Sequence, residues 1–165
     1  MTLHPLHPLT PDELRRTAEV ARTADGAADA VFISVGLREP AKEDYLAWVD
    51  ADGPLPARRG RAAIYDAQRQ VREITVDLDA GAITEDRHFP GAQPPITPDE
   101  YVAAEAAVKQ DPLMLEALAK RGITDMAEVQ VDVLAAAKMG HELEEHHRIA
   151  RCVPYLRGPL GRNGY

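Results

Sequence analysis

At 165 residues, with 45% hydrophobic and 28% charged residues, the chain has the size and composition of a globular protein with one ordinary domain or two small ones, and not those of a disordered or fibrous chain. Its formal net charge of -8 disfavours nucleic acid and anionic membrane surfaces as partners. No segment approaches the ~20 apolar residues of a membrane span, and the opening MTLHPLHPLTP lacks the regions of a signal peptide.

The chain begins with the pattern of a helix followed by a strand. Thr10-Pro11-Asp12-Glu13 combines a threonine cap, a proline at the first helical position and a glutamate that completes a capping box, so we expect a helix from there to about Ala24. Residues 31–38 should form a strand, because apolar side chains recur at the odd-numbered positions. Residues 40–60 are ambiguous, since residues 45–49 fit either a strand or part of a long connection.

Residues 61–90 show the clearest pattern, which is that of three short strands joined by tight turns. Apolar and polar side chains alternate over residues 74–78, as in a half-buried strand. A turn at residues 66–69 precedes this strand, and the glycine of residues 79–81 can supply the positive φ of a hairpin. An antiparallel sheet buries one face, so the preceding helix should cover it and make an α+β unit.

A second unit follows with the same opening. Thr97-Pro98-Asp99-Glu100 repeats Thr10-Pro11-Asp12-Glu13 at an offset of 87 residues (97 − 10) and again precedes an amphipathic helix. This helix should restart at Asp111-Pro112, and strands are expected at residues 129–134 and 148–156. The sequence therefore predicts two helix-on-sheet units that begin with the same cap.

The predicted division is a first domain of residues 1–90, a linker of residues 91–96 and a second domain of residues 97–165. Only RGPLGRNGY follows Leu156, so the second sheet would have two strands, whereas roughly three or more are needed for independent stability. We therefore expect the second domain to be truncated and the chain to be a fragment of a longer protein.

A set of short motifs in a fixed order carries a family resemblance. In chain order they are His4-Pro5-Leu6, Pro8-Leu9-Thr10, Phe32-Ile33-Ser34-Val35 running into Leu37-Arg38-Glu39-Pro40, the Trp48 to Pro56 loop, Gly91 to Pro95, and Arg148-Ile149-Ala150-Arg151-Cys152 ahead of Tyr155-Leu156-Arg157. Each motif is short, so the weight lies in their order and spacing. Together they resemble the N-terminal part of copper-containing primary amine oxidases.

The resemblance implies two cystatin-like α+β domains, the N2 domain and an incomplete N3 domain, beside a catalytic β-sandwich domain of the same protein. It also implies a homodimeric parent enzyme that converts a primary amine, O2 and water to an aldehyde, ammonia and H2O2. In the family, copper held by histidines and a topaquinone made from a tyrosine perform this chemistry. Neither set of residues is matched here, because Asn163-Gly164-Tyr165 has the wrong order and no His-x-His pair occurs. The expectation is a chain without catalytic, cofactor or metal residues that is inactive alone.

The histidine-rich segment His141 to His147 offers an alternative function as a zinc-binding protein. The HExxH zinc motif needs histidines at i and i+4, but the residue four after His141 is Glu145, and His146 lies about 140° away on a helix. A site built from His141, His146, His147 and Cys152 stays open as an alternative. Solvated acidic and histidine-rich loops are commoner than such sites.

The remaining candidate residues favour structural roles. Cys152 is the single cysteine, which fits a cytoplasmic protein, and in a strand it should be a small buried hydrophobe. Asp77 and Asp79 should be ordinary polar positions, His4 and His7 should lie in a frayed lead, Trp48 should anchor its loop by packing, and Arg58-Arg59-Gly60-Arg61 should be a solvated loop.

A second alternative is a stand-alone cystatin-like binding module, such as a peptidase inhibitor. The Gln-x-Val-x-Gly motif of such inhibitors is missing at both candidate positions, Gln70-Val71-Arg72 and Gln130-Val131-Asp132.

Overall fold

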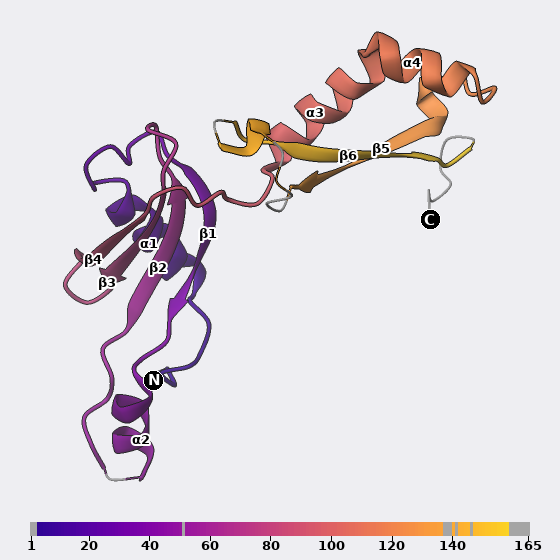
Figure 1. Cartoon of the computed structure of the whole chain (residues 1–165). Coiled ribbons are helices and arrows are strands. Elements are labelled where there is room, and N and C mark those ends of the chain that lie inside the picture. Colours follow the sequence, from indigo (N-terminus) through magenta and orange to yellow (C-terminus); the bar gives the residue numbers. More distant parts are fainter. Residues whose placement is uncertain (1–2, 51, 137–139, 141, 146, 159–165) are drawn as a thin grey trace. The chain divides into compact units, whose positions relative to one another are not determined.

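The computed structural model describes residues 3–50, 52–136, 140, 142–145 and 147–158. The chain divides into two compact units, Met1–Pro94 and Pro95–Tyr165. Each unit packs helices on an antiparallel sheet (Figure 1), which confirms the predicted α+β class.

The first unit is a helix on a four-stranded meander (Figure 1). Its helix α1 spans Pro11–Ala21 and begins with the predicted capping box at Thr10. The strands, in the order β1-β2-β3-β4, are all antiparallel to their neighbours; their bounds are Val31–Arg38, Arg59–Tyr65, Val71–Asp77 and Ala82–Phe89. Gly81 has a φ of 63° in the last hairpin, as predicted for that turn.

The core of the first unit lies between α1 and the inner face of this sheet. Its buried apolar residues are Ala21, Ala27, Ala30, Ala62, Ile64, Ile74 and Val76. Gly60 lets the helix approach the sheet, because a Cβ built there would lie 2.0 Å from Oγ1 of Thr17. Thr17 is itself fully buried, and its hydroxyl donates to the Glu13 carbonyl over 2.7 Å.

The β1 strand does not alternate evenly as its sequence suggested. The pairing register with β2 shifts between Phe32 and Ser34, which places a bulge at Ile33. As a result Phe32 and Val35 both pack against the core, although one is even-numbered and the other odd-numbered. A simple period of two cannot predict such a shift, because bulges depend on the pairing partner.

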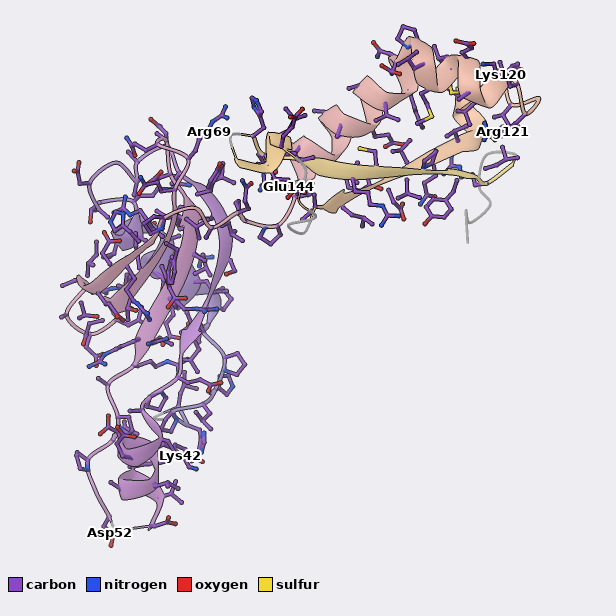
Figure 2. The ribbon with its side chains drawn as sticks, in the orientation of Figure 1. Lys42, Asp52, Arg69, Lys120, Arg121 and Glu144 are labelled. Carbon is purple, nitrogen blue, oxygen red and sulfur yellow. The ribbon has the colours of Figure 1, made fainter. Side chains whose placement is uncertain are left out.

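Residues 40–60 contain a helix, so residues 45–49 do not form the strand that was one of the two alternatives the sequence left open. Helix α2 spans Lys42–Asp50, and the connection turns back near Asp52, whose φ is 50° (Figure 2). The helix forms although it contributes no buried residue. Its sequence has acidic residues in the first turn, which favours a helix N-terminus.

The proline-rich lead is packed rather than frayed, which corrects the prediction for His4. The His4 ring lies edge-on to Trp48, with 5.3 Å between ring centroids, and 6.0 Å from the ring of Tyr45. These contacts fasten the lead to α2, and they agree with a packing role for Trp48. Leu9, at the end of the lead, is 8% exposed.

Three further boundaries differ from the predictions. Helix α1 ends at Ala21 rather than near Ala24, and Leu78 lies in the turn after β3. The basic run of residues 58–61 is not a solvated loop, because Arg59 to Arg61 belong to β2 and Arg58 forms an ion pair with Glu13.

The second unit places two helices on a two-stranded sheet (Figure 1). Helix α3 spans Pro98–Gln110 and helix α4 spans Pro112–Ala119. Strand β5 spans Val129–Ala135 and pairs antiparallel with strand β6, which spans Ala150–Leu156. The 3-10 turn η1 lies at Met126–Glu128 and the 3-10 turn η2 at Glu142–Glu145. As predicted, Thr97 caps α3 with a capping box and Asp111 caps α4. The buried core residues are Leu118, Val129, Val131 and Val133.

Helices long and apolar enough to cross a membrane are not found in the part of the chain that the structure describes.

Candidate functional site

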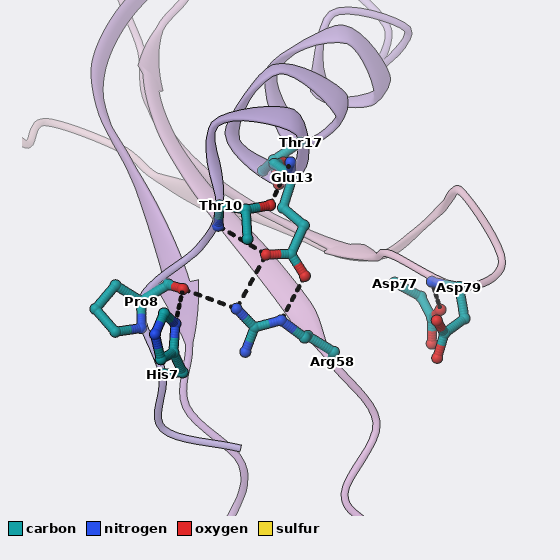
Figure 3. Close-up of polar contacts among 8 residues, drawn as sticks. All are labelled: His7, Pro8, Thr10, Glu13, Thr17, Arg58, Asp77 and Asp79. Atoms are coloured by element: carbon teal, nitrogen blue, oxygen red, sulfur yellow. Dashed lines mark hydrogen bonds and ion pairs between the residues drawn. The ribbon is translucent and has the colours of Figure 1, made fainter. Parts of the chain in front are cut away.

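One polar cluster of the first unit joins the start of α1 to the chain before β2. The backbone N–H of Thr10 donates to Oε2 of Glu13 over 2.7 Å, and the N–H of Glu13 donates to the Thr10 hydroxyl over 3.3 Å. Arg58 binds the same carboxylate, because its Nε donates to Oε1 and its Nη2 donates to Oε2 over 3.0 Å (Figure 3). Its Nη2 also donates to the Pro8 carbonyl over 2.9 Å. We call Pro8, Thr10, Glu13 and Arg58 the first arginine clamp.

The second unit contains the same cluster atom for atom. Thr97 N–H donates to Oε2 of Glu100 over 2.9 Å. Arg148 donates from Nε to Oε1 over 2.6 Å, and from Nη2 to Oε2 and to the Pro95 carbonyl over 2.8 Å each. Pro95, Thr97, Glu100 and Arg148 form the second arginine clamp. The internal repeat therefore extends from a shared cap to a shared tertiary contact.

Sequence reasoning found both caps but neither arginine. The arginines lie 45 and 48 residues after their glutamates, so no local spacing connects them. A signal was available in part, because the repeat extends two residues upstream: Pro8-Leu9-Thr10-Pro11 matches Pro95-Ile96-Thr97-Pro98. The repeated proline supplies the carbonyl that each arginine binds.

Both clamps keep their glutamates ionised. The hydrogen bond from Arg58 is the largest cause that lowers the pKa of Glu13 from 4.5 to about 2, against the opposing effect of burial. The hydrogen bond from Arg148 lowers the pKa of Glu100 to about 2 in the same way. A carboxylic acid with such a pKa is a poor proton donor or acceptor near neutral pH, so the clamps have the chemistry of structural ion pairs.

A buried arginine joins three segments of the first unit at the other end of the sheet. The Arg72 side chain is 3% exposed and donates from Nη2 to Asp86 over 2.5 Å and from Nη1 to the Asp25 carbonyl over 2.6 Å. Its Nη1 also lies 3.6 Å from Asp66, whose carboxylate caps the following turn. These charges raise the pKa of Arg72 further, mainly through Asp86. The alternating pattern of β3 gave no sign of this cluster, because it marks position 72 only as inward-facing.

The outer face of the first sheet carries a network of charges across all four strands. Arg38 and Arg61 lie 3.7 Å and 3.0 Å from Glu73, while Arg38 and Arg87 lie 3.9 Å and 3.7 Å from Glu85. Exposed pairs of this kind stabilise a protein little. They keep this face polar. The hollow of about 440 Å³ beside α2 has mixed charges as well, with Arg38 and Arg59 near Glu39 and Asp44, so it favours no one charge of ligand.

The residues of the alternative zinc site are only partly described. His141 and His146 lie outside the described residues, His147 is exposed, and Cys152 is half-buried against the second core. Across the described ranges, three or more histidine, cysteine, aspartate or glutamate side chains do not gather into a group that could hold a metal ion.

The other polar candidates serve turns. Asp77 accepts hydrogen bonds from the backbone of Asp79 over 3.0 Å and of Ala80 over 2.8 Å, so it closes the hairpin rather than forming a carboxylate pair (Figure 3). His7 hydrogen-bonds through Nδ1 to the carbonyl of Pro8, which also accepts from the first clamp.

Comparison with known proteins identifies similar chains for both units. The family model described as "Copper amine oxidase, N2 domain" matches residues 4–89. A "Primary amine oxidase" of Arthrobacter sp. (strain P1) is 35% identical over 165 residues, which are 98% of this chain and 24% of that protein. A "Peroxisomal primary amine oxidase" of Pichia angusta is 31% identical over 112 residues, which are 67% of this chain and 16% of that protein.

A solved structure has a similar fold. The copper-containing benzylamine oxidase from Hansenula polymorpha aligns with a TM-score of 0.68 and 21% identity, over 93% of this chain and 25% of that one. At this identity the likeness concerns the fold. The chain spans about a quarter of the length of the first relative and of this structure.

Proposed function

Because the chain belongs to the copper amine oxidase family, we propose that it is a non-catalytic, N-terminal region of such an oxidase. The observation that carries the proposal is the match of an N2-domain model to residues 4–89, together with a relative that the chain covers almost end to end while spanning 24% of it. The parent reaction would be the oxidation of a primary amine by O2 and water to an aldehyde, ammonia and H2O2.

The polar clusters of the described residues support a structural role. Both arginine clamps hold helix N-termini with carboxylates whose pKa is about 2, and the Arg72 cluster ties strands to loops. In the parent enzyme, copper and topaquinone would supply the oxidative chemistry. The described residues do not fit a copper ion, because they bring no group of three potential ligands together. We assign both groups to a part of the polypeptide outside this chain.

The two units correspond, in this proposal, to two successive cystatin-like domains divided as residues 1–90 and 97–165, with the linker of residues 91–96 between them. The twin clamps support this division, since each unit fastens its first helix through the same four residue types. The N2 domain would be the first unit, and an incomplete N3 domain the second.

The partner of this region would be the catalytic β-sandwich domain of the same polypeptide, within a homodimer. A cytoplasmic location fits the single cysteine, although several relatives are named peroxisomal. Cell fractionation of the natural host, with detection of this chain, distinguishes the two compartments.

The proposal is tested by loading the purified 165-residue chain with Cu²⁺ and staining it for redox-active quinone, with benzylamine and methylamine offered as substrates. We expect neither colour nor H2O2 from this chain. The longer polypeptide encoded by the same gene, loaded in parallel, should give both. Quinone colour or amine turnover from the 165-residue chain would contradict a non-catalytic role.

A further inference from the structure

The sheet of the first unit has two edge strands, β1 and β4, and they differ in charge (Figure 1). Charged side chains on an edge strand discourage another strand from pairing with it. Strand β4 carries a run of three charged residues and a histidine, which are Glu85, Asp86, Arg87 and His88. Residues 30–37, AVFISVGL, have no charged side chain, and the charges that flank them are Asp29 and Arg38. The edge of β4 is therefore protected against pairing, whereas that of β1 is not.

The backbone of β1 presents hydrogen-bonding groups at this edge. The N–H of Leu78 donates to the Arg58 carbonyl over 3.1 Å, and these two residues continue the register of β2 and β3. Because hydrogen-bonding direction alternates along a strand, the even-numbered residues of β2 bond to β3 and the odd-numbered ones to β1. Phe32 and Val35 lie opposite even-numbered residues of β2. They therefore turn their own N–H and C=O groups toward the outer edge of the sheet.

The bulge at Ile33 determines how this edge can pair with a copy of itself. Because of the bulge, the two outward-facing residues Phe32 and Val35 are an odd number of positions apart. Two antiparallel copies of β1 can then place Phe32 of each copy opposite Val35 of the other. Each of these two pairs exchanges two N–H···O bonds, so the centre of the contact gains about four main-chain hydrogen bonds.

The same register brings opposite charges together at both ends of the paired strands. Asp29 lies three residues before Phe32, and Arg38 lies three residues after Val35, so Asp29 of each copy is placed opposite Arg38 of the other. Asp29 is exposed, and the Arg38 side chain is 40% exposed. Within its own chain Arg38 lies 3.7 Å and 3.9 Å from its carboxylate neighbours, which is longer than a hydrogen bond. Both side chains can therefore take part in a new ion pair.

The pairing also keeps the two apolar cores on one side of the joined sheet. Opposite residues of paired strands point to the same face of a sheet. Phe32 and Val35 both pack against the core of their own unit. When Phe32 of one copy is opposite Val35 of the other, the inner faces of both sheets are continuous, and α1 of each copy covers its own half.

We infer that the outer edge of β1 is an interaction surface for a second copy of this chain, and that two copies pair β1 to β1, antiparallel, around a two-fold axis. This contact uses residues of the first unit alone, so it does not rest on the proposed function. A contact made by one strand edge is small, and we expect a weak dimer with a dissociation constant between about 1 μM and 1 mM.

Sedimentation equilibrium of the 165-residue chain, at concentrations from about 1 μM to about 2 mM, measures this association. The mass should rise toward that of two chains. Asp29→Arg places two arginines opposite each other at both ends, and Arg38→Asp places two aspartates there, so each variant should weaken the dimer on the order of tenfold or more. Arg87→Asp is the matched control, because Arg87 lies on the other edge strand and contacts the same Glu85 as Arg38. It should leave the association unchanged.

Mixing the two variants tests whether the occupant is a second copy. An equimolar mixture of Asp29→Arg and Arg38→Asp chains should dimerise about as tightly as the wild type, because each end again joins opposite charges. In the wild type, amide exchange at Phe32 and Val35 should slow as the protein concentration rises, since their N–H groups become bonded.

Four results would overturn the inference. The first is a chain that stays monomeric over the whole concentration range. The second is a control, Arg87→Asp, that weakens association as much as Asp29→Arg does. The third is a mixture of the two variants that associates no more tightly than either variant alone. The fourth is a dimer in which Phe32 and Val35 exchange as fast as in the monomer, because the copies would then meet at another surface.

Discussion

Replacing Gly60 by alanine should lift α1 off the first sheet. A Cβ at this position would lie 2.0 Å from Oγ1, 2.6 Å from Cγ2 and 2.9 Å from Cβ of Thr17, all shorter than real carbon contacts. Thr17 is fully buried and cannot swing into solvent. Overpacking of a core costs ~1–3 kcal/mol, while removing a glycine from a strand returns ~0.5–1 kcal/mol, so we expect a net loss of about 1–2 kcal/mol.

Urea unfolding followed by circular dichroism and by the fluorescence of Trp48 measures this loss. Trp48 is the single tryptophan and lies in the first unit, so its signal reports that unit. With a slope typical of a domain this size, the midpoint for Gly60→Ala should fall by roughly 1 M urea.

Two variants decide whether the cause is the contact with Thr17. Gly36→Ala changes a glycine of the same sheet that has no atom within 4 Å of a built Cβ, so its midpoint should stay near the wild type or rise slightly. Thr17→Ala removes the two atoms that clash most, so adding it to Gly60→Ala should recover part of the lost stability. A Gly60→Ala protein as stable as the wild type would refute the reasoning. So would a double variant whose loss of stability equals the sum of the losses of Gly60→Ala and Thr17→Ala.

Other predictions concern charge and turns. The pKa values of Glu13 and Glu100 are lowered from 4.5 to about 2, so their contribution to the free energy of unfolding is complete above pH 4.5 and is lost as the pH falls toward 2. In urea unfolding at a series of pH values, E13Q and E100Q should each reduce this loss of stability in acid by at most about 1–2 kcal/mol after solvent screening. An unchanged pH profile of stability would count against the clamps. Arg72→Met should cost about 3 kcal/mol in urea unfolding, because it leaves the partner carboxylates unpaired, and a shift below 1 kcal/mol would show that water replaces the guanidinium. Asp77→Ala should lower the free energy of unfolding by about 1 kcal/mol, seen as a lower thermal midpoint, because two hydrogen bonds of the turn are lost, whereas Asp79→Ala should leave the stability unchanged. Equal effects of the two variants would mean that the hairpin does not depend on the Asp77 side chain.

The family assignment was predictable from the sequence because it depends on the order of short motifs. The match of residues 4–89 to the N2 domain confirms the resemblance for the first unit. The same reading could not place residues 40–60, where α2 forms without burying any of its residues. With no buried face, the helix leaves no apolar period in the sequence to detect.

Within this protein, the sequence alone determined the features that act over a few residues. These features are both capping boxes, the helix cap at Asp111 and the hairpin at Gly81. Each depends on groups at most four positions apart, so the sequence predicts it without the tertiary structure. The tertiary structure alone decided which arginines close the clamps, why Arg72 is buried and why position 60 must be glycine. Apart from the ion pair between Arg72 and Asp66, these contacts join residues from 14 to 53 positions apart, and only the packing of helix on sheet brings such residues within hydrogen-bonding distance.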